Sequence, residues 1–198
     1  MSLAHGNLYD FFDARVADAV ETQKVDLGEN SRRYLALLLV ECKRSERLLT
    51  ATDRPETLAE LHLQAATADR AKAMALYRHL GDRALYVAGY FRESLNRKAV
   101  GRDYYADMGG AAYQQVATLG GTWNADVDPW THMFLELAAQ FRECMGILAE
   151  VSERNLADGT HDLVALYERW LQTKSPAIER RLHELGMIAE PETGVIEG

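Results

Sequence analysis

Tyrosine and acidic side chains gather between Leu80 and Tyr113, the part of the chain richest in groups that can hold a ligand. Four of them recur at steps of four, four and three residues: Asp82, Tyr86, Tyr90 and Glu93. A helix would place these four on one face, where rings exclude water and hydroxyls orient a small molecule. Tyrosines at helical spacing also bridge core and surface, and that interpretation stays open. The predicted ligand-binding residues are Tyr86, Tyr90, Glu93, Tyr104, Tyr105 and Tyr113.

Glycine is also concentrated here, at Gly89, Gly109 and Gly110. A glycine inside a helix costs about 1 kcal/mol relative to alanine, so another group is expected to lie close to the backbone at these positions. A crossing helix is the first interpretation, and a bound ligand is the second.

The histidines give a weaker indication of metal or haem chemistry. Helical di-iron proteins commonly use Glu followed three residues later by His, and none of the six histidines has that partner. His132 with Glu136, one helical turn apart, and His62 in an alanine-rich segment are the alternative ligands. Because surface pairs share this spacing, no metal or cofactor is predicted. A metal- or haem-dependent enzyme with a haem-oxygenase-like bundle remains the alternative function, by fold-level analogy.

Composition excludes several classes of partner. The chain has 198 residues, 47% of them hydrophobic and 26% charged, which suits one globular domain. Its net charge of −8 argues against nucleic acid or an anionic membrane as partner. We expect no membrane span and no signal peptide. Cys42 and Cys144 lack the spacing of a metal or redox motif, and they predict buried thiols in a reducing cytoplasm.

Apolar residues recur with the period of a helix, and the alternation typical of strands is nearly absent. Asp53 and Glu56 resemble a capping box for a helix that reaches residue 79. Leu80-Gly81-Asp82 then predicts the end of that helix and the cap of the next. The other predicted helices cover residues 7–23, 31–49, 82–95, 104–119 and 129–156, a segment around 163–171, and a last one from residue 176.

The helix that opens at Asp128 and Pro129 has the clearest start, because Asp is a preferred cap and Pro a preferred first residue. Seven residues along it repeat at alternating spacings of four and three: Trp130, Phe134, Leu137, Phe141, Cys144, Leu148 and Val151. This apolar seam predicts one helix to residue 156, about 42 Å long at 1.5 Å per residue. The seam can be covered within a monomer or in a homodimer, and both stay open.

The middle of the chain resembles an uncharacterised family of bacterial all-helical proteins. The shared pattern is Leu-Gly-Asp at 80–82, Leu-Tyr-Val-Ala-Gly-Tyr-Phe at 85–91, Glu-Ser-Leu at 93–95, Asp-Tyr-Tyr at 103–105, Met-Gly at 108–109 and Ala-Tyr at 112–113. The resemblance implies a bacterial cytoplasmic protein. It implies no activity, cofactor or catalytic residue.

These patterns predict an all-α protein, a mostly antiparallel bundle of seven to eight helices. Residues 1–189 are expected to form a single domain, and residues 190–198 a loosely ordered C-terminal tail. The predicted function is a non-catalytic module that binds a protein or a small ligand through the tyrosine set.

Overall fold

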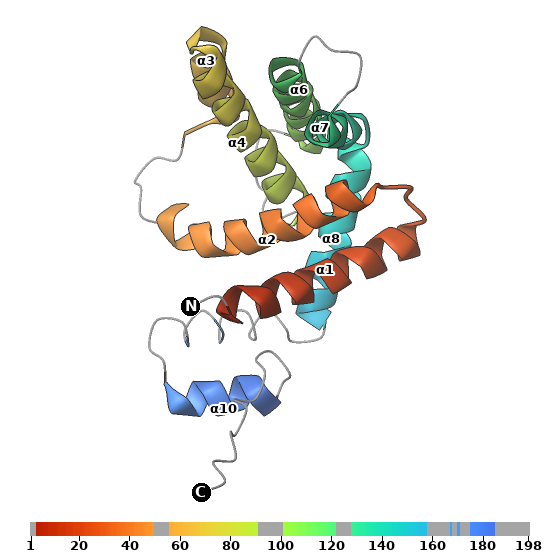
Figure 1. Ribbon diagram of the computed structural model, residues 1–198, viewed down its shortest axis with the longest axis vertical. Helices are drawn as coiled ribbons and strands as arrows, with labels where there is room; N and C mark the ends of the chain where they lie inside the picture. The colour runs from red at the N-terminus through yellow and green to blue at the C-terminus, as the bar shows by residue number, and fades with distance from the viewer. Residues whose placement is uncertain are drawn as a thin grey trace, which may run out of the picture.

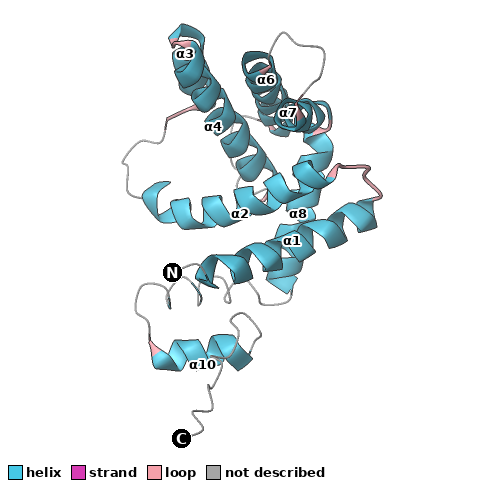
Figure 2. Ribbon diagram, viewed as in Figure 1, coloured by secondary structure: helices cyan, strands magenta, loops and turns pink. Residues whose placement is uncertain are grey.

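The computed structural model describes residues 3–49, 56–90, 101–121, 128–157, 167, 170 and 175–184. Over these residues the predicted all-α class is confirmed, since helices and loops occur and strands do not (Figure 2). None of the described helices combines the length and apolar character of a membrane span. The described helices are α1 (Leu3–Gln23), α2 (Glu29–Leu49), α3 (Leu58–Thr67), α4 (Arg70–Gly89), α6 (Arg102–Gly120), α7 (Pro129–Ala139), α8 (Phe141–Ala157) and α10 (Pro176–Glu184).

Two antiparallel helix pairs meet around α8. Helices α1 and α2 lie side by side and run in opposite directions, and α8 passes behind both of them (Figure 1). Helix α4 packs along α6 with opposite polarity, because Arg70 at the start of α4 donates to the Leu119 carbonyl near the end of α6, at 2.6 Å. The core includes Tyr113 of α6 and Phe134 and Leu137 of α7, none of which has any solvent exposure.

The predicted helix boundary at Leu80-Gly81-Asp82 is wrong, because α4 runs unbroken through it. A Cβ atom at Gly81 would lie 2.5 Å from Cδ1 of Tyr113, so this glycine admits the Tyr113 ring of α6. Asp82 does not cap a helix, since its carboxylate accepts hydrogen bonds from the Tyr34 and Tyr113 hydroxyls. Gly81 and Asp82 are residue types typical of a helix end, but at this position both make tertiary contacts inside α4.

The start of α3 also differs from the prediction. Its capping box is Thr57 with Glu60, in which the Thr57 hydroxyl accepts from the Glu60 amide at 3.1 Å and the Glu60 carboxylate accepts from the Thr57 amide at 2.7 Å. Asp53 lies outside the described residues. The boundary between α3 and α4 is set by Asp69, whose carboxylate accepts from the Lys72 amide at 3.0 Å.

The single long helix predicted from Pro129 to residue 156 is wrong, because it is interrupted at Gln140. The backbone there has φ −107° and ψ 32°, outside the helical range. Gln140 Nε2 donates to the Asp26 carbonyl at 2.9 Å, which ties the interruption to the turn between α1 and α2. The predicted seam is buried on both sides of it, with Phe134 at 0% and Phe141 at 3% exposure, whereas Trp130 is 36% exposed.

Crossing helices and their side chains lie against the three glycines, so the first interpretation of them is confirmed. A Cβ at Gly89 would lie 2.9 Å from Cβ of Leu148 in α8. A Cβ at Gly109 would lie 2.1 Å from Cζ of Phe141. Gly110 is less crowded, with its nearest neighbour, the Ala138 carbonyl oxygen, at 3.5 Å.

The neighbouring glycines Gly109 and Gly110 should therefore respond oppositely to alanine. We expect Gly109→Ala to lower the free energy of unfolding by about 1–2 kcal/mol, because the buried Phe141 ring must move. We expect Gly110→Ala to raise it by up to about 1 kcal/mol through helix propensity. Urea titrations of both variants measure this, and shifts of the same sign would contradict the helix packing.

Candidate binding site

A half-buried carboxylate joins α2, α4 and α6. Asp82 Oδ1 accepts from the Tyr34 hydroxyl at 2.5 Å and from the Tyr113 hydroxyl at 2.8 Å. Arg78 Nε donates to the Tyr34 hydroxyl oxygen at 3.1 Å and lies 3.7 Å from Asp82 Oδ2. Burial, followed by the nearby Asp82 charge, raises the pKa of both tyrosines, so both hydroxyls keep the proton that they donate. We call these four residues the Asp82 cluster.

The Asp82 cluster makes stability depend on pH. Burial raises the pKa of the Asp82 carboxyl above its ordinary value of 3.8, although hydrogen bonds from the tyrosines and the charges of Arg78 and His79 oppose the rise. The folded state then holds this proton more tightly than the unfolded state. The resulting stabilisation is complete below pH 3.8 and is lost as the pH rises through the folded-state pKa.

We therefore expect Asp82→Asn to gain in stability relative to the native chain as the pH rises from 3.8 toward neutrality. The slope of the difference cannot exceed about 1.4 kcal/mol per pH unit, which is the value for one proton. Urea unfolding of both proteins across this range measures the difference and cancels the titration of other groups. A difference that falls with pH would mean that the Asp82 pKa is lowered by folding.

The structure divides the predicted tyrosine set among several contacts. Tyr86 and Tyr90 are 3% and 4% exposed and stack on each other, with ring centroids 5.4 Å apart. Tyr104 and Tyr105 touch edge to face at 5.8 Å, and Tyr104 is 37% exposed. Tyr113 belongs to the Asp82 cluster. Glu93 lies outside the described residues.

Asn155 of α8 is a polar neighbour of this set that sequence reasoning missed. It is fully buried, and its Nδ2 donates to the Tyr90 hydroxyl at 3.3 Å. Its Oδ1 accepts no hydrogen bond from any residue that the structure describes. Tyr90 and Asn155 thus tie α4 to α8 inside the core, as part of the packing of these helices.

The alternative metal ligands belong to different surroundings. Glu136 bridges α7 to the start of α2, because its carboxylate accepts from the Gly28 amide at 2.9 Å and from the Ser31 hydroxyl. His132 is exposed one turn away, and His62 of α3 is exposed with its ring 5.7 Å from that of Tyr77. Over the residues that the structure describes, no three His, Cys, Asp or Glu side chains are grouped to hold a metal ion.

The end of α1 places a glutamine at a hollow between three helices. Helix α1 stops with Lys24 in the left-handed conformation, φ 54°, and the amides of Lys24 and Val25 donate back to the Glu21 and Val20 carbonyls. Gln23, the last helical residue, thereby faces α8, where its Nε2 donates to the Gly146 carbonyl at 3.0 Å.

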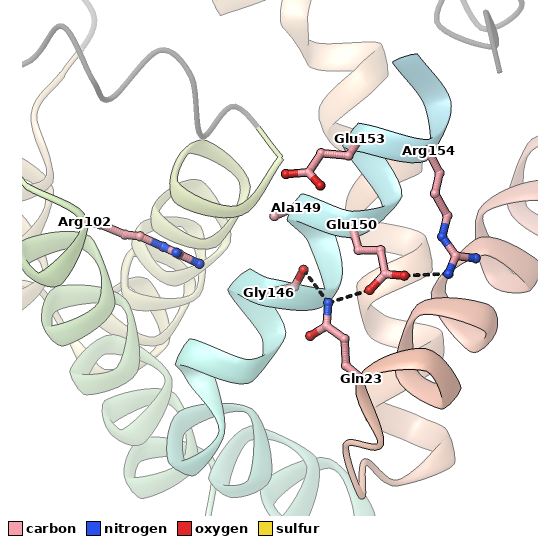
Figure 3. A pocket seen from close by; sticks show the side chains of 7 residues that line it. All are labelled: Gln23, Arg102, Gly146, Ala149, Glu150, Glu153 and Arg154. Atoms are coloured by element: carbon pink, nitrogen blue, oxygen red, sulfur yellow. Dashed lines mark hydrogen bonds and ion pairs between the residues drawn. The ribbon is translucent and has the colours of Figure 1, made fainter. Parts of the chain in front are cut away.

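This hollow, which we call the α1–α6–α8 hollow, has a volume of about 550 Å³ and opens to solvent. Figure 3 shows Arg102 reaching into it from α6, opposite the side chains of α8. The volume lies in the range of small-molecule sites. Its lining residues come from three helices: Gln23, Arg102, Gly146, Ala149, Glu150, Glu153 and Arg154.

One wall of the hollow is fixed by hydrogen bonds. Glu150 accepts from Gln23 Nε2 at 2.7 Å and from Arg154 Nη2 at 2.5 Å, so both of its carboxylate oxygens are occupied. Arg154 also donates to the Thr22 hydroxyl at 2.8 Å and lies 3.9 Å from the Asp18 carboxylate. The charges of this wall are therefore held in place before any ligand enters, which lowers the ordering cost of binding.

The opposite wall carries a charge that is not held. Arg102 is exposed in the first turn of α6, and its guanidinium forms no hydrogen bond or ion pair with another described residue. By contrast, Arg142 of α8 pairs with Asp103 at 2.5 Å and with Asp107 at 3.0 Å on the outer side of α6. Arg102 can therefore donate to a ligand in the hollow without losing a protein partner.

Comparison of the chain with known proteins gives no information on its function. No family model, no curated protein and no solved structure matches the chain.

Proposed function

We propose that this protein is a non-catalytic binding module whose site for a small polar ligand is the α1–α6–α8 hollow. The carrying observation is the combination of an open volume of about 550 Å³, one wall held by the hydrogen bonds of Gln23, Glu150 and Arg154, and Arg102 facing it without a described partner. Polar groups that are already positioned give a site its specificity.

The reactive groups of the core support the non-catalytic part of this proposal. The Asp82 carboxylate is engaged by two tyrosine hydroxyls. Burial raises the pKa of the Cys144 thiol to about 12, which keeps it from acting as a nucleophilic thiolate. Cys42 and Cys144 form no disulfide, and the proposal includes the cytoplasmic location that two thiols favour.

A thermal-shift panel tests the proposal. The full chain is melted with inorganic phosphate, citrate, AMP, spermidine, glucose or one of the standard amino acids, since a ligand that binds only the folded state raises the melting temperature. We expect at least one compound to stabilise the native protein. That compound should stabilise Ala149→Phe and Arg102→Gln less, because the first fills the hollow and the second removes the positive charge and the guanidinium donors of its open wall.

Lys72→Gln is the matched control. Lys72 is exposed at the start of α4. This end of α4 packs against the last turn of α6, whereas Arg102 lies in the first turn of α6. This variant loses a positive charge outside the hollow and should respond to the ligand as the native protein does. The proposal is wrong if no compound stabilises the native chain, or if Arg102→Gln and Ala149→Phe respond as fully as Lys72→Gln.

A further inference from the structure

The side-chain amide of Gln23 is held in one orientation at the end of α1. Its nitrogen Nε2 donates to the Gly146 carbonyl at 3.0 Å and to the Glu150 carboxylate at 2.7 Å, so both of its N–H donors are used. A flipped amide would place oxygen against these two acceptors, and the hydrogen bonds therefore assign the oxygen position. No described residue donates to this Oε1 atom, which Figure 3 shows on the side of the amide away from Glu150 and Arg154.

Gly146 of α8 provides the space for this oxygen. A Cβ atom at position 146 would lie 2.9 Å from Oε1 of Gln23, closer than such atoms come in proteins. The missing side chain thus allows the Gln23 amide to lie against the backbone of α8. Helices α1 and α8 together hold a hydrogen-bond acceptor in the wall of the hollow, and its position is set before a ligand enters.

Arg102 is the charged side chain of the hollow that stays open to a ligand. Glu150 and Arg154 pair with each other at 2.5 Å. Glu153 also has an interaction partner, so it is not a free acceptor. On the α6 wall, Arg102 makes no hydrogen bond or ion pair with another described residue. A ligand therefore meets cationic N–H donors from α6 and a neutral acceptor from α1, and the group that binds the cation should be an oxyanion.

We infer that the hollow takes a hydroxy acid, a monoanion whose carboxylate binds Arg102 and whose hydroxyl donates to Oε1 of Gln23. This inference rests on the proposed function and adds the chemical class of the ligand. Guanidinium holds a carboxylate through parallel N–H donors, which orients the ligand. The neutral Gln23 acceptor admits a hydroxyl and disfavours a second carboxylate, which has no proton to donate. Gln23 is therefore the residue that determines specificity.

Two series of probes test this class, each with an acid, its hydroxy acid and the alcohol. The shorter series is butyrate, 4-hydroxybutyrate and 1-butanol, and the longer one is hexanoate, 6-hydroxyhexanoate and 1-hexanol. Calorimetric titration of the full chain should show a hydroxy acid binding about fivefold more tightly than its matched acid, since a neutral hydrogen bond contributes about that factor. It should bind at least about tenfold more tightly than the alcohol, which lacks the charge-assisted contact.

Variants of the two walls separate the two contacts. In Arg102→Gln the advantage of the hydroxy acid over the alcohol should disappear. In Gln23→Met, which keeps the length of the side chain without its acceptor, the advantage over the acid should disappear. The same advantage should fall in Gly146→Ala, because the new Cβ displaces Oε1 of Gln23. Gly110→Ala, which adds a methyl group outside the hollow, is the matched control and should keep it. Melting curves of the unliganded variants verify that each is folded.

Two results would overturn the hydroxy-acid inference: neither hydroxy acid binding more tightly than its matched acid, or an advantage that survives in Gln23→Met. Absence of binding by all six probes would overturn it as well. In each case the proposed function stands as long as a compound of the thermal-shift panel stabilises the native chain through the hollow, so the two failures are distinguishable.

Discussion

Replacing Asp82 by alanine is expected to lower the free energy of unfolding by about 2–4 kcal/mol, because two tyrosine hydroxyls lose their acceptor inside the core. Tyr113 has no exposure and Tyr34 only 8%, so water cannot readily replace the carboxylate. The loss should be greater than that of an ordinary surface change, since α2, α4 and α6 are all joined through this oxygen. Urea unfolding at neutral pH measures it.

Asp82→Asn is the control for this effect. Its amide oxygen still accepts from both hydroxyls, and it removes the cost of burying a charge, so we expect a change within about 1 kcal/mol of the native chain. If the alanine and asparagine variants were equally stable, the hydrogen bonds that Asp82 accepts would not stabilise the fold, and this would contradict the structural role of the Asp82 cluster.

Phe134→Ala is expected to lower the free energy of unfolding by about 3–5 kcal/mol. The Phe134 ring of α7 is fully buried and meets Tyr34 of α2 at 5.2 Å and Tyr113 of α6 at 5.3 Å, both edge to face. Its removal leaves a cavity beside the two tyrosines that donate to Asp82. Guanidinium unfolding monitored by circular dichroism measures the loss.

Two substitutions calibrate this measurement. Phe134→Leu keeps most of the volume and should cost about 1 kcal/mol. Leu63→Ala, at a side chain that is 67% exposed on α3, should change stability by less than about 0.5 kcal/mol. Equal losses in Phe134→Ala and Leu63→Ala would contradict the placement of Phe134 in the core.

The fold class was predictable because helical periodicity is a local property. Leu35, Phe12 and Phe134 each lie on an apolar face read directly from spacing, and all three are fully buried. The same periodicity did not reveal the interruption at Gln140, because one non-helical residue leaves the apolar spacing of the seam unchanged. The tertiary contact made at the interruption is with the Asp26 carbonyl, which is distant in sequence.

Local signals misled where a tertiary contact uses the same residue types. Gly81 followed by Asp82 has the composition of a helix end and a new cap, yet the glycine makes space for a ring of α6 and the aspartate accepts from two tyrosines. A single sequence cannot distinguish a glycine that ends a helix from one that admits a neighbouring ring.

The hollow was not predicted, because its residues come from distant parts of the chain. Gln23, Arg102 and Glu153 meet only through the crossing of α1, α6 and α8. Their charges and amides have the composition of ordinary solvated faces. The spacing of Glu150 and Arg154 was a usable local signal, since residues four apart on a helix form ion pairs, but it does not indicate a ligand.

The position of the binding site can be measured by recording amide NMR spectra of the full chain during titration with the compound that stabilises it most in the thermal-shift panel. If the α1–α6–α8 hollow is the site, the largest shift changes occur at Gln23, Arg102, Gly146 and Glu150, and the amides of Tyr86 and Tyr90 stay in place. Largest changes at Tyr86 and Tyr90, or no change at any amide, would contradict the hollow as the site of binding.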